Sequence, residues 1–274
     1  MNFHYILSEI EKVDPEVYEK LDTRRHAMQR FSRIGGRIAM AAVPFAIGSM
    51  FSKAFGQPTS AVALEVLNYA LKLEYLEAAF YNAGVAKAGL IASADAAAFT
   101  TIQGHENAHV AFLKSAITGL SSTPVSPATY DFTAGGAFSD VMTNYATFLA
   151  VSQTFEDTGV RAYKGRAAEI VQGGVYLTAA LNIHSVEARH ASHVRTIRRK
   201  ATGDATIKSW ITNAIPTVAA VQASYTGEDN VVQAGITITG INGTAVSAAN
   251  ASEAFDEPLT EAQVLAIVKP FGVV

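Results

Sequence analysis

The sequence predicts an all-α protein built on a four-helix bundle, with a long crossover between the second and third helices. Apolar residues recur at helical spacing in four segments between residues 60 and 201. The connections inside the first and second helix pairs are short, which predicts two antiparallel hairpins. The connection between the pairs has about 17 residues, which is long enough to travel the length of a bundle.

The four helices are expected over residues 60–88, 93–118, 137–170 and 175–201. The high content of alanine, a strong helix former, supports all four assignments. The segment "SSTPVSPATYDFTAGG" forms the crossover, and "QGG" separates the third helix from the fourth. Arginine and lysine fill the last turn of the fourth helix, where positive charge is favourable.

The chain is expected to divide into an N-terminal leader (1–56), a bundle (57–203) and a C-terminal extension (204–274). Almost half of the residues are apolar, so a sizeable core is available. The net charge of −3 gives no sign of the basic face that nucleic-acid binding needs, so nucleic acid is not expected as a partner. The absence of cysteine excludes disulfides, thiolate metal sites and a cysteine nucleophile.

The leader has the charge pattern of an export signal. An arginine-rich segment (24–37) directly precedes an apolar run (38–51), which is shorter than the ~20 residues of a membrane span. The pair Arg24-Arg25 resembles a twin-arginine signal, which predicts a periplasmic or extracytoplasmic location. The alternative is an attached amphipathic helix that packs on the domain or touches a membrane surface through residues 24–55, in a cytoplasmic protein.

The extension (204–274) shows weaker patterns and little sign of chemistry. A segment that alternates like a β-strand includes Asn242-Gly243, which we expect to form a turn. Further on, Thr260 and Gln263 have the spacing of a helix capping box, so a short helix is expected to begin there.

Chemistry-bearing residues recur in matched positions of the two hairpins. The second helix contains "GHENAHVAFL" and the fourth "HSVEARHASH", each with Glu-x-x-His. Side chains three residues apart share a helix face, with Cβ atoms ~5–6 Å apart. The first and third helices each carry a Glu followed seven residues later by a Tyr. These residues are Glu74 with Tyr81 and Glu156 with Tyr163.

This pattern predicts a dimetal centre inside the bundle. Burying four carboxylates without compensation costs several kcal/mol for each ion, whereas two divalent cations neutralise them. One Glu from each of two helices plus Glu-x-x-His from the other two is the ligand set of di-iron and di-manganese bundles. Oxygen and imidazole ligands favour Fe or Mn, with zinc able to bind in vitro. The expected metal ligands and catalytic residues are Glu74, Glu106, His109, Glu156, Glu187 and His190.

Neighbouring residues leave alternatives open. Glu77 lies one turn from Glu74 and competes with it as a ligand, but the shared Glu-x6-Tyr spacing favours Glu74. Tyr81 and Tyr163 are expected either to hydrogen-bond ligand carboxylates or to be core aromatics. His105 points about 100° away from its neighbour and is expected on the surface. Asp157 is expected either on the surface or as an acid that supports a ligand. Arg161 and Arg189 are expected to pair with nearby acids, and His184 and His193 to be solvated, unless one of them supports a ligand.

At these residues the chain resembles the ferritin-like superfamily. The stretches that carry the resemblance are "LNYALKLEYLEAAFY", "HENAHVAFL", "FEDTGVRAY" and "SVEARHASHV". Within the superfamily, the chain is similar to bacterial ferritin-like domain proteins related to plant desiccation-associated proteins. The resemblance covers residues 60–203 and, more loosely, the tail "EAFDEPLTEAQVLAIVKPF". It implies a carboxylate-bridged dimetal centre, whereas the leader and extension depart from cage-forming ferritins.

We therefore expect a protein that binds two Fe (or Mn) ions and oxidises Fe(II) with O2 or H2O2, as members of the superfamily do. A structural or stress-protective protein without turnover is the alternative from another class. A di-iron hydroxylase is a third hypothesis, and it needs a channel for an organic substrate. The expected partners are metal ions and the oxidant, and self-association into a homo-oligomer is compatible with the sequence.

Overall fold

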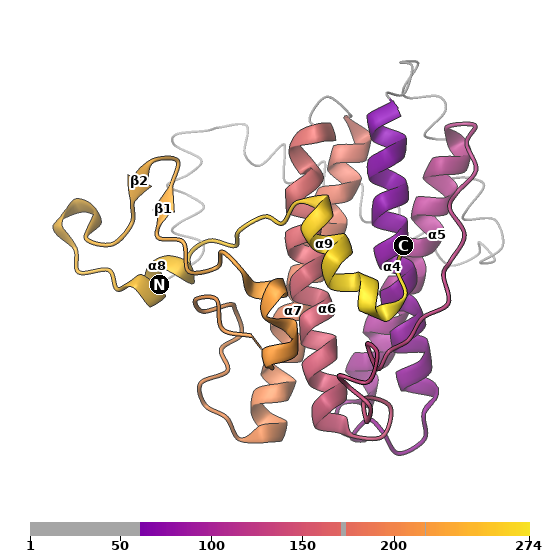
Figure 1. The fold of residues 1–274 in the computed structure, drawn as a ribbon, viewed down its shortest axis with the longest axis horizontal. Helices are drawn as coiled ribbons and strands as arrows, with labels where there is room; N and C mark the ends of the chain where they lie inside the picture. The colour runs from indigo at the N-terminus through magenta and orange to yellow at the C-terminus, as the bar shows by residue number, and fades with distance from the viewer. Residues whose placement is uncertain (1–60, 171–173, 217) are drawn as a thin grey trace, which may run out of the picture. The chain divides into compact units, whose positions relative to one another are not determined.

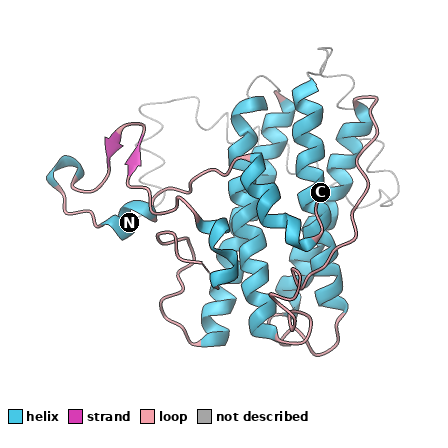
Figure 2. Cartoon of the chain, viewed as in Figure 1, coloured by secondary structure: helices cyan, strands magenta, loops and turns pink. Residues whose placement is uncertain are grey.

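The computed structural model describes residues 61–170, 174–216 and 218–274. Four long helices lie side by side in a bundle (Figures 1 and 2), which confirms the predicted all-α fold. They are α4 (Ala61–Ala86), α5 (Ala96–Gly119), α6 (Tyr145–Ala167) and α7 (Val175–Thr202). The predicted leader, with its twin-arginine pair, lies outside the described residues. None of the described helices has the length and apolar character needed to cross a membrane.

The bundle consists of two hairpins joined by a crossover. Helix α4 packs along α5, and α6 packs along α7. In Figure 1 the crossover (120–144) runs beside α5 from one end of the bundle to the other. Helices α5 and α6 therefore run parallel, whereas the helices within each hairpin are antiparallel, as the loop lengths predicted.

The third helix begins later than predicted. Helix α6 starts at Tyr145 rather than at Ala137, and residues 137–143 form consecutive turns. Asn144 caps the helix, because its side-chain oxygen accepts hydrogen bonds from two backbone N–H groups of the first turn. Phe138 and Val141 are buried within these turns. They continue the apolar spacing of the helix without its backbone, so the pattern overestimated the length of the helix.

The extension lies against the second hairpin. It contains short 3₁₀ turns, a two-stranded antiparallel hairpin and two short helices. Helix α9 crosses α6 (Figure 1), and Leu259 just before it donates a backbone hydrogen bond to Arg161 O at 3.2 Å. The predicted capping box of Thr260 and Gln263 is present at its start. The extension's elements are η2 (Ala219–Tyr225), β1 (Val232–Gln233), β2 (Ile236–Thr237), η3 (Ile241–Gly243), α8 (Ala248–Ser252), α9 (Glu261–Val268) and η4 (Lys269–Phe271).

Asn242 and Gly243 form a turn, as predicted, because Thr244 donates a backbone hydrogen bond to Ile241 O at 3.0 Å and φ is 54° at Asn242 and 73° at Gly243. The turn that joins the two strands is a different one. The two strands are joined by Ala234 and Gly235, whose φ angles are 50° and 80°. Positive φ at both central positions is the requirement of a type I′ turn. Asn-Gly meets this requirement more easily than Ala-Gly, but the pairing of Val232 with Thr237 fixes the turn. Asn242 and Gly243 form part of η3.

Two apolar clusters fill the bundle. On α5 and on α7, the predicted ligand residues lie between the residues of one cluster and those of the other. On α5, Phe99 and Ile102 belong to one cluster, and Leu113 and Ile117 to the other. Glu106 and His109 come between these pairs. The same division holds on α7, where the segments 176–183 and 194–197 contribute to different clusters. The polar residues thus occupy one layer in the middle of the bundle.

Helix α6 is buried on nearly all sides. Its residues from Phe148 to Tyr163 are all buried, polar ones included. A helix on the rim of a bundle normally exposes one face to water. Here the extension covers that face, since Phe271 of η4 packs edge-on against Phe155 with ring centroids 4.8 Å apart. The extension therefore helps to keep the middle layer dry.

Candidate metal centre

All six predicted ligand residues meet in the middle layer, and we call them the carboxylate–histidine cluster. The four carboxylates are fully buried, and His190 is 5% exposed. The i, i+3 spacing places Glu106 and His109 on one face of α5, and it places Glu187 and His190 on one face of α7. The cluster consists of Glu74 (α4), Glu106 and His109 (α5), Glu156 (α6), and Glu187 and His190 (α7).

The cluster contains two overlapping groups that share two carboxylates. The Glu74–His109 group also includes Glu106 and Glu187, and the Glu156–His190 group includes the same two acids. Within each group, one oxygen or nitrogen atom from each residue lies within 4.8 Å of the others. Atoms held this close by buried side chains can surround one cation in each group.

The shared carboxylates present one oxygen to each group. Glu106 Oε2 lies 3.1 Å from His109 Nδ1, and its Oε1 lies 2.8 Å from His190 Nδ1. Glu187 Oε1 lies 3.2 Å from His109 Nδ1, and its Oε2 lies 3.9 Å from His190 Nδ1. This arrangement suits a carboxylate that bridges two cations, one on each side.

The two tyrosines hold carboxylates across the hairpins. Tyr163 donates a hydrogen bond to Glu74 Oε1 at 2.5 Å, and Tyr81 donates one to Glu156 Oε1. Burial, followed by the nearby carboxylate charge, raises the pKa of both hydroxyls well above the usual value, so both remain donors. Each tyrosine thus fixes the glutamate of the opposite hairpin, rather than the one seven residues before it in the sequence.

The charges of the cluster are poorly compensated by the protein alone. Burial raises the pKa of Glu106 to about 7, although the neighbouring His109 and His190 lower it. Burial, and then repulsion from Glu106 and Glu74, raises the pKa of Glu187 well above its usual value. Burial lowers the pKa of His190, but the carboxylates overcome that effect and raise it to about 11. Without cations, the cluster therefore retains protons at neutral pH.

Several buried atoms lack a hydrogen bond, which tests whether the residues fit cations. Among the described residues, Glu106 Oε1, Glu156 Oε2, both carboxylate oxygens of Glu187 and His190 Nδ1 have no partner in acceptable geometry. Buried polar atoms are normally satisfied, so such a concentration calls for an explanation. All five atoms face the inside of the two groups, where a divalent cation would satisfy them. The residues present therefore fit a pair of metal ions.

Glu77 lies beside the cluster but outside both groups, whereas Glu74 is inside one. Glu77 is only 5% exposed, and burial and repulsion from Glu187 raise its pKa well above the usual value. Gly159 of α6 makes room here, because a Cβ atom at that position would lie 3.3 Å from Glu77 Oε1 and 3.5 Å from Glu187 Oε2. The geometry therefore groups Glu74, rather than Glu77, with the other candidate ligands.

His105 has a contact that its exposed position did not predict. Its Nδ1 lies 2.9 Å from Nε2 of His190, and the two rings stack with centroids 5.1 Å apart. Burial and the neighbouring His190 lower the pKa of His105. The signal in the sequence was the first His in "HENAH", but helical geometry directs His105 away from Glu106 rather than toward it. It reaches the cluster through α7 instead.

Asp157 and Arg161 connect α6 to the extension rather than to the cluster. Asp157 is buried, so the surface alternative for it was wrong; it pairs with Arg195 and accepts a hydrogen bond from Tyr225 Oη at 2.7 Å. Arg161 pairs with Glu228 at 2.7 Å, as an ion-pairing role predicted. Because these charges are compensated locally, they form a structural link and not a second centre.

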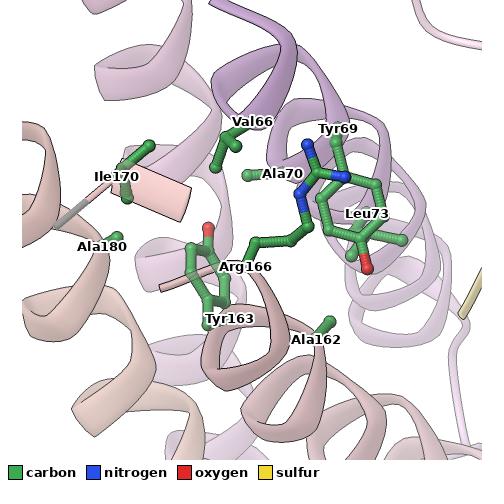
Figure 3. A pocket seen from close by; sticks show the side chains of 9 residues that line it. All are labelled: Val66, Tyr69, Ala70, Leu73, Ala162, Tyr163, Arg166, Ile170 and Ala180. Carbon is green, nitrogen blue, oxygen red and sulfur yellow. The ribbon is translucent and has the colours of Figure 1, made fainter. Parts of the chain in front are cut away.

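A small pocket lies next to the cluster. Val66, Ala70, Ile170, Ala180 and Tyr163 line it between α4, α6, η1 (Ala168–Ile170) and α7 (Figure 3). It encloses about 10 Å³, which is close to the space one water molecule needs. Tyr163 lines this pocket, and its hydroxyl donates a hydrogen bond to Glu74 of the cluster.

The fold and the cluster together define a helical-bundle protein whose interior can hold metal ions. Residues 63–200 match the sequence model of the ferritin-like domain family, and the chain therefore belongs to that family. The matched segment begins inside α4 and ends inside α7, so it includes the whole cluster. A search of curated proteins found no match.

Proposed function

We propose that this protein binds two Fe (or Mn) ions in the carboxylate–histidine cluster and oxidises Fe(II) with O2 or H2O2. The observation that carries the proposal is the pair of shared carboxylates, each with one oxygen toward either group. Four ionised carboxylates balance the charge of two divalent cations. A pair of iron ions, when bound, supplies the electrons that reduce the oxidant.

The chain's own residues would bind, hold and shield the ions. Glu106 and Glu187 would bridge, while Glu74 with His109 and Glu156 with His190 would complete the two positions. Carboxylate and imidazole ligands suit iron and manganese, and no cysteine competes. The tyrosine hydroxyls orient two of the carboxylates, and the apolar clusters on either side exclude water.

Two finer statements belong to the same proposal. The motif stretches support a relation to the desiccation-associated branch of the superfamily, and Arg24-Arg25 supports export from the cytoplasm. N-terminal sequencing of protein from the native host tests export. A chain that begins at residue 1 in the mature protein would contradict cleavage of a signal.

The central experiment measures metal content and then turnover. Purified protein is expected to bind two metal ions per chain, and anaerobic Fe(II) loading followed by O2 or H2O2 is expected to oxidise the iron. The double variant Glu106→Ala, Glu187→Ala should lose both properties, because it removes both shared carboxylates. Asp229→Asn, which changes an exposed acid of the extension, is the matched control and should keep both.

The possible outcomes separate the competing functions. A folded wild-type protein that binds no Fe(II) or Mn(II) would refute the metal centre. Tight binding of two ions without oxidation of Fe(II) would favour the structural or stress-protective role. In that case the bound metal should still raise the melting temperature of the protein.

A further inference from the structure

The two histidines of the cluster differ in what lies behind them. His190 directs Nδ1 toward the carboxylates, at 2.8 Å from Glu106 and 3.2 Å from Glu156. Its other ring nitrogen, Nε2, contacts Nδ1 of His105 at 2.9 Å. His109 also directs Nδ1 toward carboxylates, but within the described part of the chain no protein group hydrogen-bonds its Nε2. The two halves of the cluster are otherwise closely matched.

The chemistry of imidazole gives this difference a consequence. A neutral histidine carries its proton on one ring nitrogen and offers a lone pair on the other. If Nδ1 of His190 binds a cation, its proton must be on Nε2, where it can be donated to His105. A hydrogen-bond acceptor at that position fixes the tautomer and the orientation of the ring, and raises its basicity as a ligand.

The stacked arrangement adds a second constraint on the same ring. The planes of His105 and His190 are 11° apart, with centroids separated by 5.1 Å. Since His105 is exposed and His190 is buried, His105 also covers the ligand ring on its solvent side. His109 lacks both the acceptor and a parallel ring of this kind, because its ring is inclined by 31° to His190 at 6.5 Å.

We propose that His105 is a positioning residue for His190, and that it makes the Glu156–His190 group the tighter of two unequal cation positions. The inference rests on the proposed function in that two cations must bind. It goes beyond that function because it ranks the two positions and assigns a role to a residue outside the ligand set. His105 contacts neither a cation nor an oxidant, and acts only through the ring that it orients.

The test is an anaerobic titration of the full chain with Co(II), followed by calorimetry and by visible absorption. Wild type should bind two ions in two distinguishable steps. His105→Phe keeps a flat ring but removes the acceptor, and should weaken the tighter step about 10- to 100-fold while changing the absorption of the first ion bound. His105→Asn retains an acceptor and should restore most of the affinity. His193→Phe, at an exposed histidine of α7, is the control.

A double-mutant cycle separates positioning from a general effect on the bundle. In a His190→Ala background, His105→Phe should cause no further loss, whereas in a His109→Ala background it should cause the full loss. Equal losses in both backgrounds, or unchanged binding by His105→Phe alone, would overturn the proposal. A wild-type protein that binds fewer than two Co(II) ions would overturn the proposed function as well, so the two failures are distinguishable.

Discussion

Replacing Glu106 with glutamine should stabilise the metal-free protein and abolish its stabilisation by metal. Burial raises the pKa of Glu106 from 4.5 to about 7, so ionising it in the folded protein is unfavourable. A shift of that size corresponds to about 3 kcal/mol at pH 8, where the unfolded chain is fully ionised. Glutamine has a similar shape but carries no charge, and it therefore removes this cost. For a domain of this size the gain amounts to an increase in Tm of about 6–12 °C.

The sign of the effect changes with pH in a defined way. In wild type, the folded state holds a proton on Glu106 between pH 4.5 and about 7 that the unfolded state releases. Unfolding therefore becomes easier as the pH rises through this window. At pH 5 the advantage of Glu106→Gln should fall below about 1 kcal/mol, because little charge is then buried in either protein.

The assay is urea unfolding at pH 5 and pH 8, first with a chelator and then with saturating Mn(II). Wild type should gain about 2.7 kcal/mol for each of its two ions, or about 5 kcal/mol in all, at a Mn(II) concentration 100 times the Kd of each, and the variant should gain far less. The order of stability should thus reverse when metal is added. Asp229→Asn is the control for losing an acid on the surface, and its stability should change by less than about 0.5 kcal/mol.

One result would refute the reasoning directly. If metal-free Glu106→Gln is less stable than metal-free wild type at pH 8, the carboxylate is compensated by the protein itself. The buried atoms without hydrogen bonds would then need another explanation.

Three further predictions concern residues around the cluster. Glu77→Gln should retain two metal ions per chain by elemental analysis, whereas Glu74→Gln should lose one; equal behaviour would mean that the geometry has separated them wrongly. Tyr81→Phe removes a hydroxyl that holds a cluster carboxylate, and calorimetry should detect metal binding that is 10- to 100-fold weaker. Gly165→Ala would place a Cβ 1.9 Å from Leu259 O, so its free energy of unfolding should fall by about 1–3 kcal/mol or more, with metal stoichiometry unchanged.

The sequence predicted the bundle and the composition of the cluster because both depend on local spacing. An i, i+3 pair such as Glu106 and His109 shares a face in any α-helix, whatever surrounds it. Helix order and loop length then determine which faces meet. The family match over residues 63–200 and the two groups around Glu106 and Glu187 are consistent with that logic.

Features that depend on contacts between distant residues were harder to predict. The tyrosine pairs cross between hairpins, so Tyr81 serves Glu156, which lies 75 residues away, and not Glu74 on its own helix. His105 reaches His190 although they are 85 residues apart. Sequence spacing identifies which residues share a face, but it does not give the rotation of one helix against another, and that rotation decides which side chains touch.

Local patterns also failed where tertiary contacts replaced the regular backbone. Phe138 and Val141 keep helical spacing in a segment of turns, because the core accepts apolar side chains from either kind of backbone. Asn242-Gly243 forms the turn that its sequence predicts, but the two strands are joined at Ala234-Gly235, which has the weaker turn preference. Packing decided the backbone in the first place, and strand pairing decided the turn in the second.

The extension shows how a segment outside the cluster can support the bundle's interior. Glu156 lies on α6, whose outer face would meet water if the bundle stood alone. Arg161 holds the extension over that face through hydrogen bonds to Ser224 O at 2.5 Å, Thr226 O at 2.6 Å and Glu257 O at 2.7 Å. Water that reached α6 would solvate the carboxylates and weaken their need for cations. The dry environment that makes the four acids unstable alone is therefore also what makes them strong ligands.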